Sequence, residues 1–272
     1  MSSSNLGDAV ILFVRTSRWT TARRMVQLSI IALLASPLAG VTFFQGTLSA
    51  AEIFGLPIAD PLAALQVMMA SGVAVPAYIV SAAGVTLFYF LLGGRSFCSW
   101  VCPVYLVTEL GDKVRERLQS GKRTVSLSFK QGLLLMTLVA TMLTGLPFFE
   151  TLSPVGMVGR AVAFGSWVGL ASIAGVVVAE IFFARRVWCR SLCPLGAYYA
   201  IVGSSAPLKV RFEAQRCTGC GDCSRVCPVE EVLEPSLKSG AESVRSGECT
   251  RCGLCIDVCK PEALKATYSF SK

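Results

Sequence analysis

The feature that most constrains this chain is a pair of cysteine quartets in its last quarter. The first runs from Cys217 to Cys227 and the second from Cys249 to Cys259, and both have the spacing C-x2-C-x2-C-x3-C. Three closely spaced thiolates can bind three irons of one cubane, and a fourth cysteine one helical turn further along can reach a second cubane. The spacing therefore predicts two 4Fe–4S clusters, each bound by three cysteines of one quartet and by the last cysteine of the other.

This exchange of the last cysteine fixes the expected ligands. One cluster is predicted to bind Cys217, Cys220, Cys223 and Cys259, and the other Cys249, Cys252, Cys255 and Cys227. A zinc site and a disulfide knot are the alternatives, but zinc sites usually place two C-x2-C pairs further apart. The glycines among the ligands are expected to let the backbone bend around each cluster.

The rest of the chain is too apolar for an ordinary soluble domain. Hydrophobic residues make up 53% of the sequence, mean hydropathy is +0.61, and the apolar residues lie in long runs. Because roughly 20 apolar residues cross a bilayer core, four runs are predicted to span a membrane, at about 25–44, 74–92, 132–149 and 161–184. The prediction is an all-α membrane protein with four transmembrane helices, followed by a C-terminal α+β two-cluster ferredoxin-like domain.

The distribution of charge predicts the orientation of these spans. Lysines and arginines gather in the N-terminal tail, between the second and third spans, and after the fourth span. The positive-inside rule therefore places both termini in the cytoplasm of a multi-pass protein of the bacterial inner membrane. The expected organisation is a cytoplasmic tail (1–24), a transmembrane domain (25–208) and a cytoplasmic ferredoxin-like domain (209–272).

The chain contains no histidine. This absence excludes histidine-ligated haem, Rieske ligation and histidine-based metal sites. Redox chemistry must therefore rest on the twelve cysteines, and all of them are predicted to lie on the cytoplasmic side, where thiols stay reduced.

A second cysteine motif, C-x3-C-P, occurs twice, at Cys98–Pro103 and at Cys189–Pro194. Each copy follows two predicted spans, which indicates two parallel two-helix repeats. The proline should end each helical turn at the second cysteine. The repeat would bring four thiols into one joint site, formed by Cys98, Cys102, Cys189 and Cys193. Soft all-sulfur sites favour an iron–sulfur centre or zinc, whereas a pair of redox thiols and four small buried residues are the alternatives.

Three carboxylates are candidate proton acceptors. Glu180 lies inside the fourth predicted span, where an ionisable side chain is costly and is a functional candidate by default, although it could also reach water at the interface. Asp60 and Glu150 lie near the opposite face. Asp60 is followed by Pro61, a pair that also predicts the N-cap of a short helix.

The combination of four spans, two C-x3-C-P motifs and a two-cluster module resembles the NapH-type ferredoxin-like membrane subunits of periplasmic nitrate reductase systems. The motifs that carry the resemblance are Cys98–Pro103, Trp188–Gly196, Phe149–Gly156, Asp60–Pro61 and the eight ferredoxin cysteines. It implies a quinol dehydrogenase that takes electrons from the membrane quinol pool. The electrons would pass to a periplasmic iron–sulfur subunit and on to cytochrome and reductase subunits, with no nucleic acid as partner.

Other interpretations stay open at this point. Methylamine-type relatives of similar size share the same motifs. A membrane ferredoxin could instead serve the maturation or reactivation of a periplasmic metalloenzyme, and a membrane anchor could carry clusters that are only structural.

Overall fold

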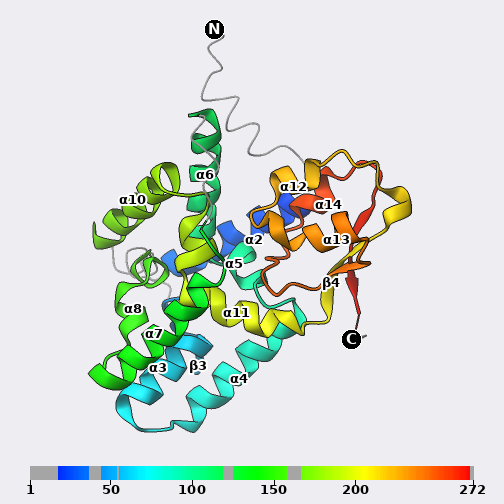
Figure 1. Cartoon of the computed structure of the whole chain (residues 1–272). Coiled ribbons are helices and arrows are strands. Elements are labelled where there is room, and N and C mark those ends of the chain that lie inside the picture. Colours follow the sequence, from blue (N-terminus) through cyan, green and yellow to red (C-terminus); the bar gives the residue numbers. More distant parts are fainter. Residues whose placement is uncertain (1–17, 37–43, 54, 119–124, 159–166, 270–272) are drawn as a thin grey trace.

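The computed structural model describes residues 18–36, 44–53, 55–118, 125–158 and 167–269. A helical part precedes a smaller ferredoxin-like part, which lies beside α2, α5 and α11 (Figure 1). The helices of the first part are α2 (Arg18–Ala35), α3 (Pro61–Ser71), α4 (Pro76–Leu91), α5 (Ser96–Trp100), α6 (Pro103–Arg117), α7 (Phe129–Thr144), α8 (Phe148–Leu152), α10 (Trp167–Phe182) and α11 (Pro194–Ser204).

A small antiparallel sheet leads into α3. Its strands are β1 (Phe44–Gly46), β2 (Ala50–Ile53) and β3 (Leu56–Ala59), in that order. Asp60 then caps α3, because its Oδ1 accepts the N–H groups of Leu62 at 2.9 Å and Ala63 at 3.1 Å. The short N-capped helix predicted from Asp60 and Pro61 is thus confirmed.

The prediction of four transmembrane helices is wrong. Helices α4 and α7 have 16 residues each, about 24 Å of helix, against a hydrocarbon core of about 30 Å. Helix α7 stops because Gly145 adopts a left-handed φ of 66°. The 18-residue helix α2 contains Arg23 and Arg24.

Within the described ranges, every helix is either too short or too polar to cross a bilayer. The all-α transmembrane fold class is therefore corrected, and β1–β3 add strands where only helices were expected. The predicted multi-pass inner-membrane location is corrected on the same ground.

The ferredoxin-like part is built on a three-stranded antiparallel sheet. Its elements are β4 (Leu208–Phe212), α12 (Asp222–Val226), α13 (Glu234–Ser239), β5 (Ser243–Val244), α14 (Leu254–Val258) and β6 (Leu264–Tyr268), with 3-10 turns at Ala214–Arg216 and Glu230–Val232. The strand order is β5-β4-β6, and β4 pairs with β6 from Leu208–Tyr268 to Phe212–Leu264. Helices α12 and α14 lie against each other, and each connects the third cysteine of a quartet to the fourth, so the predicted α+β module is supported.

Helix α2 packs against α14 and joins the two parts of the molecule. The N–H groups of Trp19 and Thr20 donate to the carboxylate of Asp257 at 3.3 and 3.0 Å. A Cβ on Gly253, whose φ is +77°, would lie 2.6 Å from the Cβ of Trp19. Only glycine therefore allows this approach of α2 to the second quartet.

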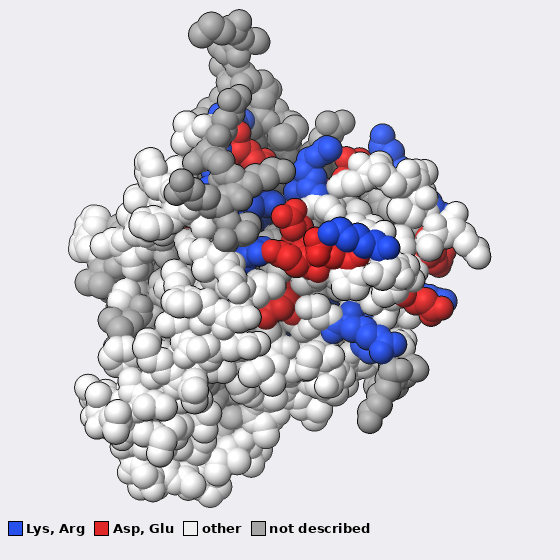
Figure 2. All heavy atoms as spheres, in the orientation of Figure 1, with Lys and Arg blue, Asp and Glu red and all other residues white. Residues whose placement is uncertain are grey.

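Charged side chains are unevenly spread over the surface. On the face shown in Figure 2 they gather over the ferredoxin-like part and the neighbouring end of the helical part, whereas the surface around α3, α4 and α7 is uncharged. Exposed large apolar side chains include Val80, Leu87 and Phe88 on α4 and Leu135, Met142 and Leu143 on α7. Apolar surfaces of this extent are typical of interaction sites.

Candidate iron–sulfur sites and an adjoining cavity

Two cavities divide the eight ferredoxin cysteines into two groups of four. The first, of about 190 Å³, is lined by Cys217, Cys220, Cys223 and Cys259. The second is smaller and is lined by Cys227, Cys249, Cys252 and Cys255. The last cysteine of each quartet thus lies with the first three of the other quartet, which is the grouping expected from the spacing.

The backbone around these cavities fits a cubane. Gly221 and Gly253 precede α12 and α14 with left-handed φ angles of 75° and 77°, so the chain turns tightly at the equivalent point of both quartets. The N–H of Gly219 donates to the Sγ of Cys217 at 3.4 Å, an arrangement that stabilises negative charge on sulfur.

The two groups differ in exposure. Cys220 is exposed, whereas Cys227, Cys252 and Cys255 are buried. Burial raises the pKa of the Cys227 and Cys255 thiols, so both are protonated at neutral pH until a metal displaces the proton. The first group therefore lies at the surface and the second lies inside the molecule.

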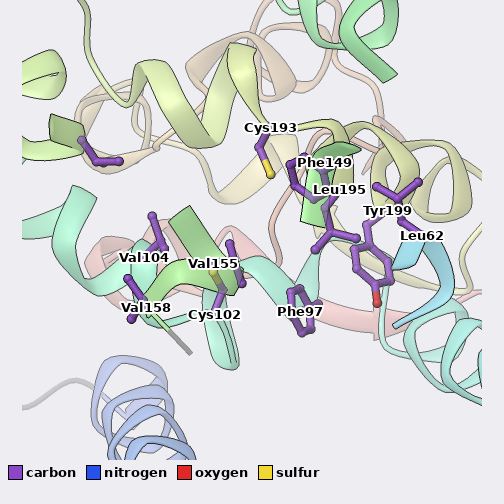
Figure 3. Close-up of a cluster of buried hydrophobic side chains, with 11 residues drawn as sticks. Leu62, Phe97, Cys102, Val104, Phe149, Val155, Val158, Cys193, Leu195 and Tyr199 are labelled. Atoms are coloured by element: carbon purple, nitrogen blue, oxygen red, sulfur yellow. The ribbon is translucent and has the colours of Figure 1, made fainter. Parts of the chain in front are cut away.

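The two C-x3-C-P motifs are built alike. Cys102 and Cys193 are both extended N-caps, with ψ angles of 120° and 110°, and a proline begins the helix after each. The prediction that the turn ends at the second cysteine is thereby confirmed. Figure 3 shows both side chains in one buried hydrophobic cluster. The turn before Cys193 is a π-helix, Trp188–Leu192, a conformation that is frequent at functional sites.

The four C-x3-C-P cysteines share one neighbourhood. Burial, and then the charge of Cys98, raises the pKa of Cys193 to about 12. The pKa of Cys102 is raised first by burial and then by Cys189, Cys98 and Cys193. Among the residues whose placement is described, no three His, Cys, Asp or Glu side chains converge on a point suited to a single metal ion. A cubane differs in this respect, because each of its thiolates binds a different iron.

Buried cations connect these motifs to the ferredoxin-like part. Arg95 donates from Nη2 to the carbonyl oxygen of Cys189 at 2.7 Å and from Nη1 to the carboxylate of Glu248 at 2.6 Å. Lys130 pairs with the same carboxylate. Burial, and then repulsion by Arg95, lowers the pKa of Lys130 to about 8. Because Glu248 directly precedes Cys249, this ion cluster holds the second C-x3-C-P motif against the second quartet.

A small cavity lies between the C-x3-C-P motifs and the ferredoxin-like part. Cys98 and Cys189 line it from the helical part, and Pro228 and Thr250 line it from the ferredoxin-like part. Since Pro228 follows Cys227 and Thr250 follows Cys249, the C-x3-C-P cysteines adjoin the buried group of ferredoxin cysteines.

A larger apolar cavity, of about 380 Å³, adjoins α5. Phe97 and Val101 line it and are the chain neighbours of Cys98 and Cys102. Its polar lining residues are Thr47, Asp60, Tyr89 and Tyr199, and the others are Ile30, Leu33, Leu34, Leu48, Ala51, Ile58, Ala59, Gly84, Val85 and Phe88.

Asp60 is the carboxylate of this cavity. Its Oδ2 accepts a hydrogen bond from the hydroxyl of Tyr199 at 3.3 Å, and the Tyr199 ring stacks on Phe97 with a centroid distance of 5.1 Å. Burial raises the pKa of Asp60 to about 7. Of the three carboxylates considered from sequence, this is the one that the structure places in the cavity.

Glu180 and Glu150 lie elsewhere. Glu180 is buried on α10, where its Oε1 accepts the N–H of Trp188 at 3.3 Å. Burial, and then the charge of Asp112, raises its pKa to about 8. Glu150 lies in the first turn of α8, and neither side chain lines the apolar cavity.

Sequence reasoning missed two relationships in this region. Arg95 and Glu248 are 153 positions apart, and Asp60 and Tyr199 are 139 positions apart. Arg95 and Tyr199 lie close in sequence to the C-x3-C-P motifs, which marks them as candidate site residues. Their positions do not indicate which residue each of them contacts.

Comparisons with known proteins agree with this arrangement. A family model described as a 4Fe–4S dicluster domain matches residues 209–260, and one described as a 4Fe–4S binding domain matches residues 74–122 and 166–212. Each stretch matched by the second model contains one C-x3-C-P motif, which supports the internal repeat.

Three curated relatives cover most of the chain. The methylamine utilization ferredoxin-type protein MauN is 36% identical in Methylorubrum extorquens (89% of this chain, 86% of the relative) and 38% identical in Paracoccus denitrificans (91% and 89%). The ferredoxin-type protein NapH of Escherichia coli is 32% identical (80% and 78%). No solved structure matches the chain significantly.

Proposed function

Since the chain belongs to the family of ferredoxin-type 4Fe–4S electron-transfer proteins that includes MauN and NapH, we propose that it oxidises a quinol and passes the electrons to a redox partner. The observation that carries this proposal is the apolar cavity of about 380 Å³ beside Cys98 and Cys102. Ligand pockets typically have volumes of about 300–1,000 Å³, apolar walls and a few placed polar groups. A quinol has the matching chemistry, with an apolar ring and two hydroxyl groups.

Eight cysteines are proposed to hold two 4Fe–4S clusters, in the two groups that line the ferredoxin cavities. When bound, each cluster supplies a one-electron acceptor, so that a two-electron donor can be oxidised in single steps. Cys98, Cys102, Cys189 and Cys193 are proposed to form a joint thiolate site between the quinol cavity and these clusters.

The packing supports one order in which electrons would pass between the sites. Phe97 and Val101 connect the cavity to the first C-x3-C-P motif. Cys98 and Cys189 in turn adjoin Pro228 and Thr250 of the ferredoxin-like part. The order is therefore the quinol cavity, the C-x3-C-P site, the buried ferredoxin group and the exposed ferredoxin group.

The redox partner is proposed to approach the exposed ferredoxin group. Cys220 is solvent-exposed there, and electron transfer favours a short path from donor to acceptor. We expect the partner to be an iron–sulfur subunit of a larger oxidoreductase system. The 36–38% identity to proteins of methylamine utilization, against 32% to NapH, favours a methylamine-type system over nitrate reduction.

The test is to add a short-chain quinol to the anaerobic protein and follow the visible absorption and the EPR signal of the clusters. We expect reduction in the wild type and a large loss of rate in Gly84→Leu. Gly84 lines the cavity, and an added Cβ there meets no atom within 4 Å, so the new side chain would occupy part of the quinol site.

Gly132→Leu is the matched control. Gly132 lies on α7, also faces open space, and does not line the cavity, so its reduction rate should stay unchanged. The proposal fails if dithionite reduces the wild-type clusters but quinol does not, at any ratio of quinol to quinone.

A further inference from the structure

We infer that Asp60 is the catalytic base that takes the quinol protons, and that Tyr199 positions its carboxylate. This inference rests on the proposed function and names the residue that would accept the quinol protons. The two oxygens of Asp60 have different surroundings, and this difference is the first observation that supports the inference.

One oxygen of Asp60 caps helix α3, and the other takes no part in the cap. Oδ1 accepts the N–H groups of Leu62 and Ala63 at the start of α3. Oδ2 accepts only the hydroxyl of Tyr199 among the hydrogen bonds found in the described residues, at the relatively long distance of 3.3 Å. A helix cap requires one oxygen, so the cap leaves the second oxygen of this cavity-lining residue unused.

Acidic groups from three elements face Asp60 within the part of the chain that the structure describes. Those whose charge interacts with it there are Glu150 from α8, Tyr89 from α4, and Tyr198 and Tyr199 from α11. All four are acids. Burial raises the pKa of Asp60 to about 7, and Glu150 acts in the same direction. A base is most effective when its pKa lies near the working pH, so this carboxylate can both take and release a proton.

The reaction balances with this single base. Oxidation of one quinol breaks two O–H bonds and yields one quinone, two protons and two electrons. Each proton passes to Oδ2 of Asp60 and then to water, which can reach the cavity beside Ile58, a lining residue that is 41% exposed. The two electrons need one-electron acceptors, and the two clusters that the ferredoxin cysteines would hold would supply them, one electron each.

Tyr199 is suited to hold the base in place. The residue is fully buried at 0% exposure and lies between Phe97, on which it stacks, and Tyr89, which meets it edge-on at 5.3 Å. This packing holds the hydroxyl in place, and its hydrogen bond to Oδ2 fixes the orientation of that oxygen.

The test compares Asp60→Asn with the wild type in single-turnover reduction by a short-chain quinol. Asparagine is as good an N-cap as aspartate, so α3 keeps its cap while the base is lost. Because general-base catalysis contributes about 100- to 10,000-fold, we expect the rate to fall by at least about 100-fold. Reduction by dithionite and the affinity for a non-reducible quinone analogue should stay unchanged.

The dependence of the rate on pH separates catalysis from structure. The wild-type rate should rise as the pH increases through about 7, and the rate of Asp60→Asn should be independent of pH in that range. Tyr199→Phe retains the ring stack and should shift this rise, while Asp60→Glu should restore part of the rate.

Two failures can be told apart. If quinol reduces the wild type and Asp60→Asn equally fast, or if the variant loses only affinity for the analogue, the role of Asp60 is overturned and the proposed function stands. If quinol does not reduce the wild type while dithionite does, both are overturned. Should Asp60→Asn fail to fold, a wild-type rate that does not change across about pH 6–8 overturns the role of Asp60.

Discussion

Glu248 accepts a hydrogen bond of 2.6 Å from Nη1 of Arg95, whose Nη2 donates to the carbonyl oxygen of Cys189 at 2.7 Å. Glu248 directly precedes Cys249, and Lys130 pairs with the same carboxylate. One buried ion cluster therefore connects a C-x3-C-P motif to a ferredoxin quartet, and it fixes the separation of two groups that we propose to exchange electrons.

Removing the anion from this cluster should destabilise the protein strongly. The side chains of Arg95 and Lys130 are 1% and 0% exposed, so Glu248→Gln leaves two buried cations without a counter-charge. Breaking a buried ion pair by removing one partner typically costs about 3–5 kcal/mol. We expect a loss of this size in the free energy of unfolding, measured by anaerobic urea denaturation.

The exposed pair of Lys238 and Glu234 supplies the control for that loss. Their side chains are 73% and 52% exposed, and surface ion pairs contribute about 0–1 kcal/mol. Glu234→Gln should therefore have little effect. Equal urea midpoints for Glu248→Gln and Glu234→Gln would contradict the account of the buried cluster.

Gly253→Ala should disturb the docking of α2 on the second quartet. The substitution would place a Cβ 2.6 Å from the Cβ of Trp19 at a φ of +77°, so it combines a clash with backbone strain. We expect lower stability and less bound iron per chain, and Trp19→Gly in the same protein, which removes the clashing Cβ, should relieve the clash but not the strain.

Gly132→Ala is the matched substitution in a helix with open space around it. Alanine is favoured over glycine inside a helix by about 0.5–1 kcal/mol, so this variant should be slightly more stable than the wild type. An equal gain for Gly253→Ala would show that α2 does not approach the quartet as described.

Cys227→Ser should affect the same cluster as Cys252→Ser. Cys227 belongs to the first quartet in sequence but lines the cavity of the second. Spin quantitation and iron analysis of the two variants should show loss of the same EPR signal and of about four of about eight irons. If Cys227→Ser instead removes the signal that is lost in Cys223→Ser, the grouping of ligands is wrong.

The burial of Asp60 should make stability depend on pH. Its folded-state pKa of about 7 lies above the value of about 3.9 expected in the unfolded chain. Between these values the folded state holds the proton and the unfolded state does not, so stability falls as the pH rises through this window, by at most about 1.4 kcal/mol per pH unit.

Asp60→Asn removes this titration while it retains the helix cap. The stability of the wild type relative to Asp60→Asn should therefore decrease from about pH 5.5 to about pH 7 and level off above about pH 8. A difference between the two proteins that stays constant over that range would show that the Asp60 carboxyl titrates normally.

The sequence predicted best those features that depend on nearby residues. The cysteine spacing anticipated how the eight ferredoxin cysteines divide between the two cavities, because the distance from Cys223 to Cys227 is one helical turn; that these cysteines bind clusters stays a prediction. Asp60 before Pro61 anticipated a cap, because a cap involves only the next few residues. The C-x3-C-P turns followed in the same way from the effect of proline on Cys102 and Cys193.

Features that depend on distant residues were not predicted. A hydropathy pattern counts apolar residues without marking where a helix stops, so it predicts a membrane span across the left-handed turn at Gly145 that ends α7. Arg23 was expected in a polar tail, but it is buried against Glu109, which is 86 positions away. No local pattern pairs such residues. The apolar cavity could not be predicted for the same reason, because its lining comes from α2, β2, β3, α4, α5 and α11 and from the segments next to them.

The central claim is that quinol binds in the apolar cavity beside the C-x3-C-P motifs, and photoaffinity labelling tests it most directly. An azidoquinone would be irradiated with the anaerobic holoprotein, and the labelled peptides identified by mass spectrometry. The account predicts labels within residues 47–60 and 84–101, which contain most of the residues that line the cavity, and loss of those labels when excess short-chain quinol competes. Labelling confined to residues 208–268, or labelling of the cavity that excess quinol does not reduce, would contradict it.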